Sequence, residues 1–270
     1  MDDYFGEKKP VKVLFILLFC GRGVGYYIYV VLSTEFPYNF AEGATLLVDK
    51  PIDWTSFDVV KKIRVIIKAK IGHAGTLDPL ATGLMILCTG KFTKKLTDFQ
   101  GLDKTYTGAF YLGATRPSFD RETEIDETFD ISGLTEDAIR AATKPFIGDI
   151  DQMPPIYSAI KKDGKKLYTH ARQGTEVVIE PRKVRIDQFE ITKIELPLVY
   201  FSVKCSKGTY IRSLAHDFGK ALNAGAHLHE LRRTAVGDFS IDDAWQLNEL
   251  VDYLNENKAL FLRHEGVSKR

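Results

Sequence analysis

The chain has 270 residues, of which 44% are hydrophobic and 27% charged, and its net charge is +1. These values are typical of globular proteins and argue against a disordered chain or a disulfide scaffold. The three cysteines are far apart and form no CxxC pair, which argues against a thiolate zinc site and favours a reduced, cytoplasmic setting. His227 and His229 would share one face of a strand, but without a third ligand nearby we interpret them as structural.

The charge is unevenly distributed along the chain. Residues 120–151 contain ten acidic and three basic side chains, whereas residues 153–185 contain eight basic and three acidic ones. A nearly neutral protein with one basic face can still bind a polyanion, because lysine and arginine displace condensed counterions. Charge runs of this kind are also common on ordinary solvated surfaces. Composition alone therefore leaves a nucleic-acid partner open.

Residues 1–43 differ from the rest of the chain. Residues 13–19 and 26–32 are apolar, and a charge and three glycines lie between them. A membrane-spanning helix over residues 12–32 is one interpretation, weakened by Arg22 and the glycines. A signal peptide and a start site placed too far upstream are the others. We favour the last, and we expect residues 1–43 to be an extension outside the domain that follows.

From residue 44 onward, strand and helix patterns alternate without a βαβ rhythm. Thr55, with Asp58 three positions on, predicts a helix start. Apolar residues then recur at helical spacing through residue 67. Turn residues separate the later segments. The predicted strands are 45–49, 84–88, 104–112, 184–194, 198–205 and one around 231–233, and the predicted helices follow Thr55 and Thr135, run from Gly208 to about 222, and cover 246–254. This order predicts an α+β fold with a largely antiparallel sheet.

The loop at residues 72–83, GHAGTLDPLATG, is the most unusual segment. Its three glycines permit left-handed or tight backbone geometry. Pro79 favours an extended conformation at Asp78, so the carboxylate would sit on a defined turn. Such a loop suits a carboxylate nucleophile. Asp-Pro is also a common turn pair, so loop chemistry by itself leaves the role of Asp78 open.

Six separate motifs in the chain resemble the bacterial tRNA pseudouridine-55 synthases of the TruB type, in the order found in that family. The loop at residues 72–83 is similar to the family's catalytic loop, and the motifs together cover about residues 44–240. The other motifs are LLVDKPIDWTS (46–56), KTY (104–106), PPIYSAIK with GKKLY and ARQG (154–174), GTYIRSL (208–214) and LRRT (231–234).

The resemblance implies a pseudouridine-synthase-like fold, with a largely antiparallel mixed sheet flanked by helices. We expect the catalytic domain to span residues 44–250 and to include an RNA-binding thumb at about residues 150–176. Residues 251–270 would then form a short C-terminal tail, too short for the PUA domain that many relatives carry. The turn after Gly113 departs from the family pattern, because Thr123 replaces a glycine there.

The resemblance also assigns roles to single residues. Asp78, Tyr106 and Arg212 would be catalytic, and His73, Tyr106, Tyr210 and Leu231 would bind the substrate uridine. Asp78 would attack either C6 of the uracil or C1′ of the ribose, and the residues leave that choice open. Tyr106 would stack on the flipped base, and Arg212 would pair with Asp78 and keep it ionised.

The resemblance implies the T-arm of tRNA as the partner, with uridine 55 as the target. The basic residues of the thumb would grip its phosphates; these are Lys161, Lys162, Lys165, Lys166 and Arg172. The reaction needs no cofactor or metal, and we expect a cytoplasmic monomer without a protein partner. Two alternatives stay open: an RNA-binding or tRNA-folding module without catalysis, and a membrane-tethered version that depends on residues 12–32.

Overall fold

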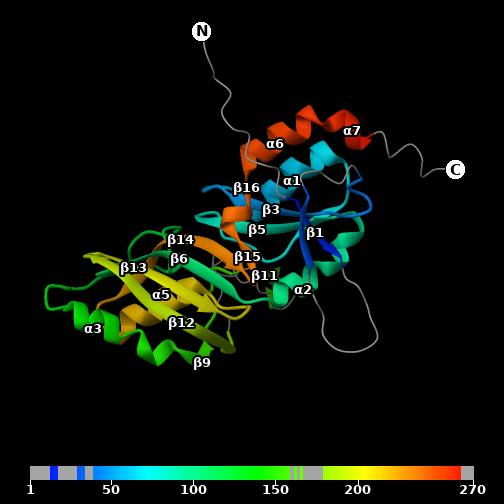
Figure 1. Ribbon diagram of the computed structural model, residues 1–270. Coiled ribbons are helices and arrows are strands. Elements are labelled where there is room, and N and C mark those ends of the chain that lie inside the picture. The colour runs from blue at the N-terminus through cyan, green and yellow to red at the C-terminus, as the bar shows by residue number, and fades with distance from the viewer. Residues whose placement is uncertain are drawn as a thin grey trace, which may run out of the picture. The chain divides into compact units, whose positions relative to one another are not determined.

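A computed structural model describes residues 13–17, 29–33, 39–158, 161–162, 165–166 and 179–262 (Figure 1). The chain divides into two compact units. Unit 1 comprises Met1–Pro79, Gly83–Gln100 and Phe239–Arg270, and unit 2 comprises Leu80–Thr82 and Gly101–Asp238. Each unit combines a mainly antiparallel sheet with helices, which confirms the predicted α+β class.

Unit 1 is built on strands in the order β2-β1-β3-β5. These strands are β1 (Val13–Leu17), β2 (Tyr29–Ser33), β3 (Thr45–Lys50) and β5 (Ala81–Thr89), and all their pairings are antiparallel. Two short strands extend the sheet: β4 (Ile71–His73) pairs with β5, and β16 (Trp245–Gln246) pairs in parallel with β3. All six residues of β3 are buried, so this strand forms the centre of the unit.

The helices of unit 1 follow local sequence signals. Helix α1 (Ser56–Ile67) begins with the predicted capping box, in which Thr55 and Asp58 satisfy each other's main-chain N–H groups. The apolar residues at helical spacing face the core, as predicted; they are Val59, Val60, Ile63, Ile66 and Ile67. The remaining helical segments are η1 (Gly90–Lys95), α2 (Leu96–Gly101), η3 (Ile241–Asp243), α6 (Leu247–Glu256) and α7 (Lys258–Leu262). Residues 251–256 and 258–262 of the expected C-terminal tail are therefore helical.

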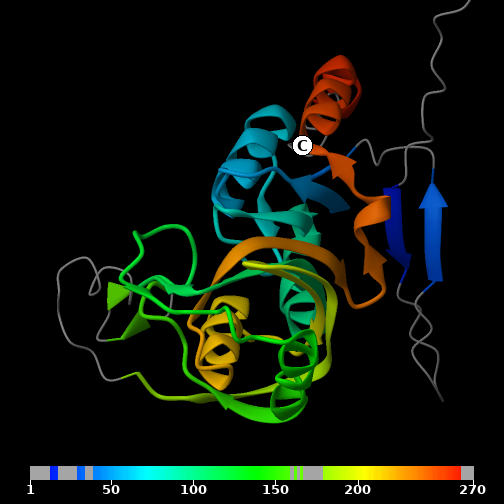
Figure 2. The same cartoon turned by 90° about the vertical axis from the view of Figure 1, so that its left-hand side faces the viewer.

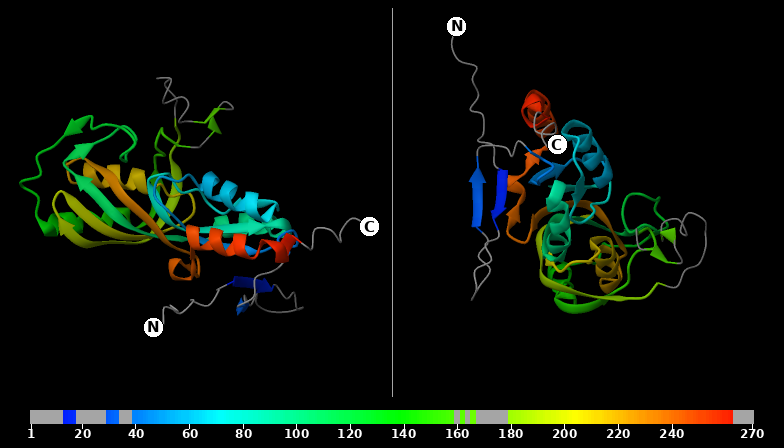
Figure 3. Two further views of the ribbon diagram at one scale, coloured as in Figure 1. Left: turned by 90° about the horizontal axis from the view of Figure 1, so that it is seen from above. Right: turned by 90° about the vertical axis from the view of Figure 1, so that its right-hand side faces the viewer.

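The N-terminal extension contributes structure to unit 1. Strands β1 and β2 form an antiparallel pair at one edge of its sheet (Figure 3), where Leu14 of β1 is in register with Thr45 of β3. Over the described residues, no helix has the length and apolar character needed to span a bilayer.

Unit 2 is built on strands in the order β14-β6-β13-β12-β9, all antiparallel. They are β6 (Lys104–Leu112), β9 (Gly148–Gln152), β12 (Arg182–Glu195), β13 (Leu198–Cys205) and β14 (Ala226–Val236). The sheet curves around helix α5 (Ile211–Ala221), as Figure 2 shows. Smaller elements are β7 (Ala114–Thr115), β8 (Glu127–Thr128), α3 (Glu136–Ala141), η2 (Lys144–Phe146) and the pair β10 (Lys161–Lys162) with β11 (Lys165–Lys166). Strand β15 (Phe239–Ser240) follows at the return to unit 1.

A cluster of phenylalanines fixes α5 on the sheet of unit 2. The ring of Phe110 on β6 stacks on Phe201 of β13, with 4.2 Å between the centroids. The same ring lies 5.5 Å from Phe218 of α5. Aromatic rings at these separations add about 0.5–1.5 kcal/mol per pair beyond their burial. The face of β6 that carries Phe110 is therefore the face that α5 covers.

Candidate active site

The Asp78 loop lies in unit 1 between β4 and β5. Leu77 is buried, while Asp78 beside it is half-buried. The Ala74 N–H donates to the Ile86 carbonyl over 2.9 Å. Gly75 has φ 88°, a conformation that side chains rarely adopt. The loop therefore holds the geometry that its glycines predicted.

The first turn of α1 and the segment before it are hydrogen-bonded to this loop. The Ser56 hydroxyl accepts a hydrogen bond from the Leu77 N–H at 2.9 Å and donates to the Leu77 carbonyl at 3.1 Å. The Asp53 N–H donates to the Pro79 carbonyl at 3.0 Å. The residues on both sides of Asp78 are thus hydrogen-bonded to the segment around Asp53 and Ser56.

Lys50, the last residue of β3, is fully buried beneath the same loop. Its ammonium group donates to the carbonyls of Trp54 at 2.6 Å, Pro51 at 2.9 Å and Pro79 at 3.2 Å. Burial lowers the pKa of Lys50 from 10.5 to about 8, and nearby carboxylates oppose the change, Asp78 most strongly. Lys50 is therefore both a support for the loop and a positive charge beside Asp78.

In unit 2, Tyr210 and Arg212 lie at the N-terminal end of α5. The Arg212 guanidinium lies 3.6 Å from the Asp120 carboxylate, and both side chains are more than 90% buried. It also donates to the carbonyls of Tyr157 at 2.9 Å and Ser118 at 3.4 Å. These contacts hold the guanidinium in one orientation. The predicted pairing of Arg212 with Asp78 stays a prediction.

The base of the predicted thumb is fastened to the same end of α5. The Gln152 side chain accepts from the Tyr210 N–H at 2.8 Å and donates to the Tyr210 carbonyl at 3.0 Å. The Ser213 hydroxyl donates to the Met153 carbonyl at 2.7 Å. The Arg182 guanidinium lies over the Tyr210 ring, 5.0 Å from its centroid. Gln152 at the start of the predicted thumb and Arg182, which follows the thumb in the chain, therefore both contact Tyr210.

Tyr106 and Leu231 lie on the face of the sheet that α5 covers. Residues i and i+2 of a strand share a face, so Tyr106 lies on the same side of β6 as Gly108 and Phe110. Leu231 of β14 is directly opposite Gly108. A Cβ on Gly108 would lie 2.0 Å from the Glu230 carbonyl oxygen, so only glycine fits there. Unit 2 thus brings together Tyr106, Leu231, Tyr210 and Arg212 on the α5 side of its sheet.

The turn that carries Asp120 is held by Thr123, the residue that departs from the family pattern. The Thr123 hydroxyl accepts from the Ser118 N–H at 3.1 Å and lies 2.9 Å from the Ser118 hydroxyl. Phe119 has φ 62°, and its ring stacks on His216 of α5 with 4.0 Å between the centroids. Side-chain hydrogen bonds therefore stabilise the turn that presents Asp120 to Arg212.

The remaining predicted residues lie elsewhere. His73 is half-buried in β4 of unit 1. The thumb lysines form the two-strand pair β10–β11, in which Lys161 is in register with Lys166 and Lys162 with Lys165. Arg172 lies outside the described residues. His227 is buried, its Nδ1 lies 3.1 Å from the Ala114 carbonyl, and Arg116 donates to its Nε2.

Four supporting residues have no role in the sequence-based prediction: Lys50, Ser56, Asp120 and Gln152. A lysine at the end of an apolar strand, as in TLLVDK, is the one signal that could have been noticed. A buried lysine needs specific partners. The partners of the other three residues are distant in the chain, and no local pattern indicates them.

The geometry agrees with the comparisons to known proteins. Residues 62–211 match the TruB family pseudouridylate synthase N-terminal domain, and residues 212–264 match the tRNA pseudouridylate synthase B C-terminal domain. The tRNA pseudouridine synthase B of Flavobacterium johnsoniae is 57% identical over 216 residues, covering 77% of this chain and 94% of that protein. The enzyme of the same name from Phocaeicola vulgatus is 48% identical, covering 82% and 97%.

Solved structures show the same fold. A chain from the crystal structure of a Cbf5-Nop10-Gar1 complex aligns with a TM-score of 0.64 and 31% identity. The alignment covers 87% of the present chain and 60% of that chain. A chain from an archaeal box H/ACA Nop10-Cbf5 complex aligns with a TM-score of 0.60 and 30% identity, covering 86% and 58%. The present chain thus spans less than two thirds of the length of these structural relatives.

Fold and sequence together define a pseudouridylate synthase, an isomerase that converts uridine into pseudouridine. Within that class, the chain belongs to the TruB family. This confirms the resemblance that the motifs indicate.

Proposed function

We propose that the protein isomerises uridine 55 in the T-arm of tRNA, with Asp78 as the nucleophile. The single observation that carries this proposal is the fixation of the Asp78 loop by Lys50, Ser56 and the Asp53 main chain. A half-buried carboxylate on so well supported a loop suits a group that must meet a substrate atom in one geometry. The names of the curated relatives support tRNA as the RNA.

The reaction breaks the bond between N1 and C1′, turns the base, and forms a bond between C5 and C1′. C5 loses a proton and N1 gains one, so atoms and charge balance without an oxidant or reductant. The target uridine is stacked in folded RNA and must be flipped out to be reached. Asp78 attacks C6 or C1′, and the proposal includes both routes.

The residues on the α5 side of unit 2 would receive the flipped base. Tyr106 would stack on the uracil, while Tyr210 and Leu231 would line its pocket. The guanidinium of Arg212, held by Asp120 and two carbonyl groups, would orient the Asp78 carboxylate. His73 and the thumb residues Lys161, Lys162, Lys165, Lys166 and Arg172 would contact the RNA.

Tritium release from C5-labelled uridine in a T-arm RNA tests the proposal, because pseudouridine formation expels that hydrogen. Wild type should release tritium, and Asp78→Asn should release none above background. Asp98→Asn is the matched control, since Asp98 is an exposed carboxylate on α2. Equal release by wild type and Asp78→Asn would refute the nucleophile. An inactive wild type that still refolds tRNA would favour the non-catalytic alternative.

A further inference from the structure

Helix α1 of unit 1 carries a basic face that the proposed reaction does not use. Lys61, Lys62, Arg64 and Lys68 are exposed, and among the described residues none of them forms a salt bridge. Lys61, Arg64 and Lys68 are three and four residues apart, so these three cations form a row along the helix. The one acid within α1, Asp58, is occupied in the capping box, where its carboxylate accepts from the N–H and hydroxyl of Thr55.

Apolar side chains are interspersed with these cations. Phe57 is 60% exposed and Val65 is 68% exposed. They share one side of the helix with Lys61, because residues four apart are neighbours. Exposed lysine and arginine beside an exposed aromatic ring suit RNA, whose phosphates take the charges and whose bases stack on rings.

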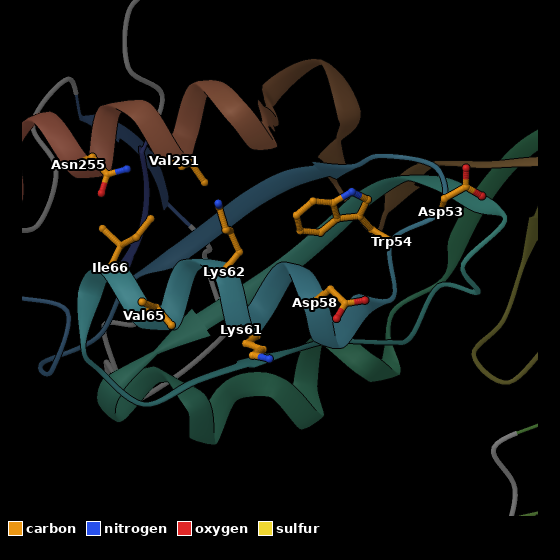
Figure 4. Close-up of a pocket in the computed structure, with 9 residues that line it drawn as sticks. All are labelled: Asp53, Trp54, Asp58, Lys61, Lys62, Val65, Ile66, Val251 and Asn255. Atoms are coloured by element: carbon orange, nitrogen blue, oxygen red, sulfur yellow. The ribbon is translucent and has the colours of Figure 1, made fainter.

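A groove of about 560 Å³ runs between α1 and α6 beside this face. The residues that line the α1–α6 groove include Asp53, Trp54, Asp58, Lys61, Lys62 and Asn255. Figure 4 shows Lys62 extending from α1 towards α6, with the Trp54 indole beside it. An indole face, an ammonium group and the Asn255 amide are the groups that bind a nucleotide by stacking, charge and hydrogen bonding. The volume is within the range of small-ligand sites, about 300–1,000 Å³.

The position of α1 connects this surface to the Asp78 loop. Ser56 in its first turn is hydrogen-bonded to Leu77. The helix has 12 residues and is therefore about 18 Å long. An RNA whose uridine lies at Asp78 has further nucleotides within reach of this length, and the whole path belongs to unit 1.

We propose that the basic face of α1 and the α1–α6 groove form a second RNA-binding surface, which takes the backbone of the tRNA outside the target nucleotide. Lys61, Arg64 and Lys68 contact successive phosphates, and an unpaired nucleotide enters the groove against Trp54. This inference rests on the proposed function, because it takes tRNA as the RNA that reaches Asp78.

Fluorescence anisotropy with a full-length tRNA transcript, titrated at several KCl concentrations, tests the surface. At about 0.15 M salt the double variant Lys61→Glu with Lys62→Glu should bind roughly 10- to 30-fold more weakly, and its plot of log K against log salt should be shallower by about 1.5. Lys144→Glu with Lys220→Glu is the control, since it makes the same charge change on exposed lysines of unit 2. This control should bind within twofold of wild type. Thermal melting confirms that each variant folds.

A second variant tests the side of the groove that α6 forms. Asn255→Asp adds one negative charge on α6 without changing side-chain size, and tRNA binding should weaken about threefold to tenfold. If both α1 and α6 variants bind tRNA like the control, the inference is wrong. The inference is also wrong if the α1 and α6 variants lose binding to anionic vesicles or to a partner protein while their affinity for tRNA is unchanged.

Failure of the two proposals can be told apart. Wild type that binds tRNA through α1 and yet releases no tritium would contradict the proposed function alone. Wild type that releases tritium while the α1 and α6 variants bind like the control would contradict the second surface alone.

Discussion

Replacing Lys50 by methionine should weaken the support of the Asp78 loop while changing the free energy of unfolding little. Burial lowers the pKa of Lys50 from 10.5 to about 8, so the charged amine is disfavoured in the folded chain by roughly 3 kcal/mol relative to the neutral amine. Methionine fills a similar volume and removes this penalty, but it also removes three hydrogen bonds to carbonyl groups. The two effects oppose each other, and we expect stability at pH 7 to change by less than about 2 kcal/mol.

The Lys50→Met substitution should affect catalysis more strongly than it affects the free energy of unfolding. Without Lys50 the Pro79 carbonyl keeps one hydrogen bond, from the Asp53 N–H, and Asp78 loses its electrostatic interaction with a buried cation. A displacement of about 1 Å at a catalytic group can cost roughly 100-fold in rate. We therefore expect kcat for tritium release to fall about 10- to 100-fold in Lys50→Met, with KM for RNA nearly unchanged.

The pH dependence of unfolding provides an independent measurement. Between pH 8 and 10.5 the unfolded chain binds a proton on Lys50 that the folded chain has lost, so wild type gains stability as pH rises through this window. Urea unfolding should show the wild-type advantage over Lys50→Met increasing by roughly 3 kcal/mol from pH 8 to 10.5. Lys204→Met, an exposed lysine on β13, should show no such change. A constant difference between wild type and Lys50→Met across this window would refute the argument.

Two further substitutions, one in each unit, test residues that hold the site in place. Ser56→Ala should destabilise the fold by about 2 kcal/mol, because it leaves a buried N–H and a carbonyl of the loop without their partner. Ser56→Ala should also lower kcat. The control Thr97→Ala, on the exposed surface of α2, should change neither stability nor kcat. Urea unfolding of Ser56→Ala equal to that of wild type would contradict the prediction. Asp120→Asn should cost about 3 kcal/mol, because it removes the carboxylate beside the buried Arg212. This cost should lower Tm by roughly 6–12 °C in calorimetry, and a Tm equal to that of wild type would show that the pair contributes nothing.

The sequence by itself determined the longer strands and helices of the fold. The strand predicted at residues 104–112 is β6, and Thr55 and Thr135 cap α1 and α3. These signals are local, because capping and side-chain periodicity depend on residues a few positions apart. Segments without such patterns were missed. No prediction covered residues 90–101, which form η1 and α2, or Gly148–Gln152, which forms β9.

The motifs also indicated the family and Asp78, but only the tertiary structure decided what supports the site. Arg212 and Asp120 are 92 positions apart, and Lys50 donates to a carbonyl 29 positions away. Whether a charged side chain is buried, and which group compensates it, depends on contacts that only the folded chain creates. Lys50 therefore appeared in the sequence as one residue of a motif, and in the structure as a buried cation beneath the Asp78 loop.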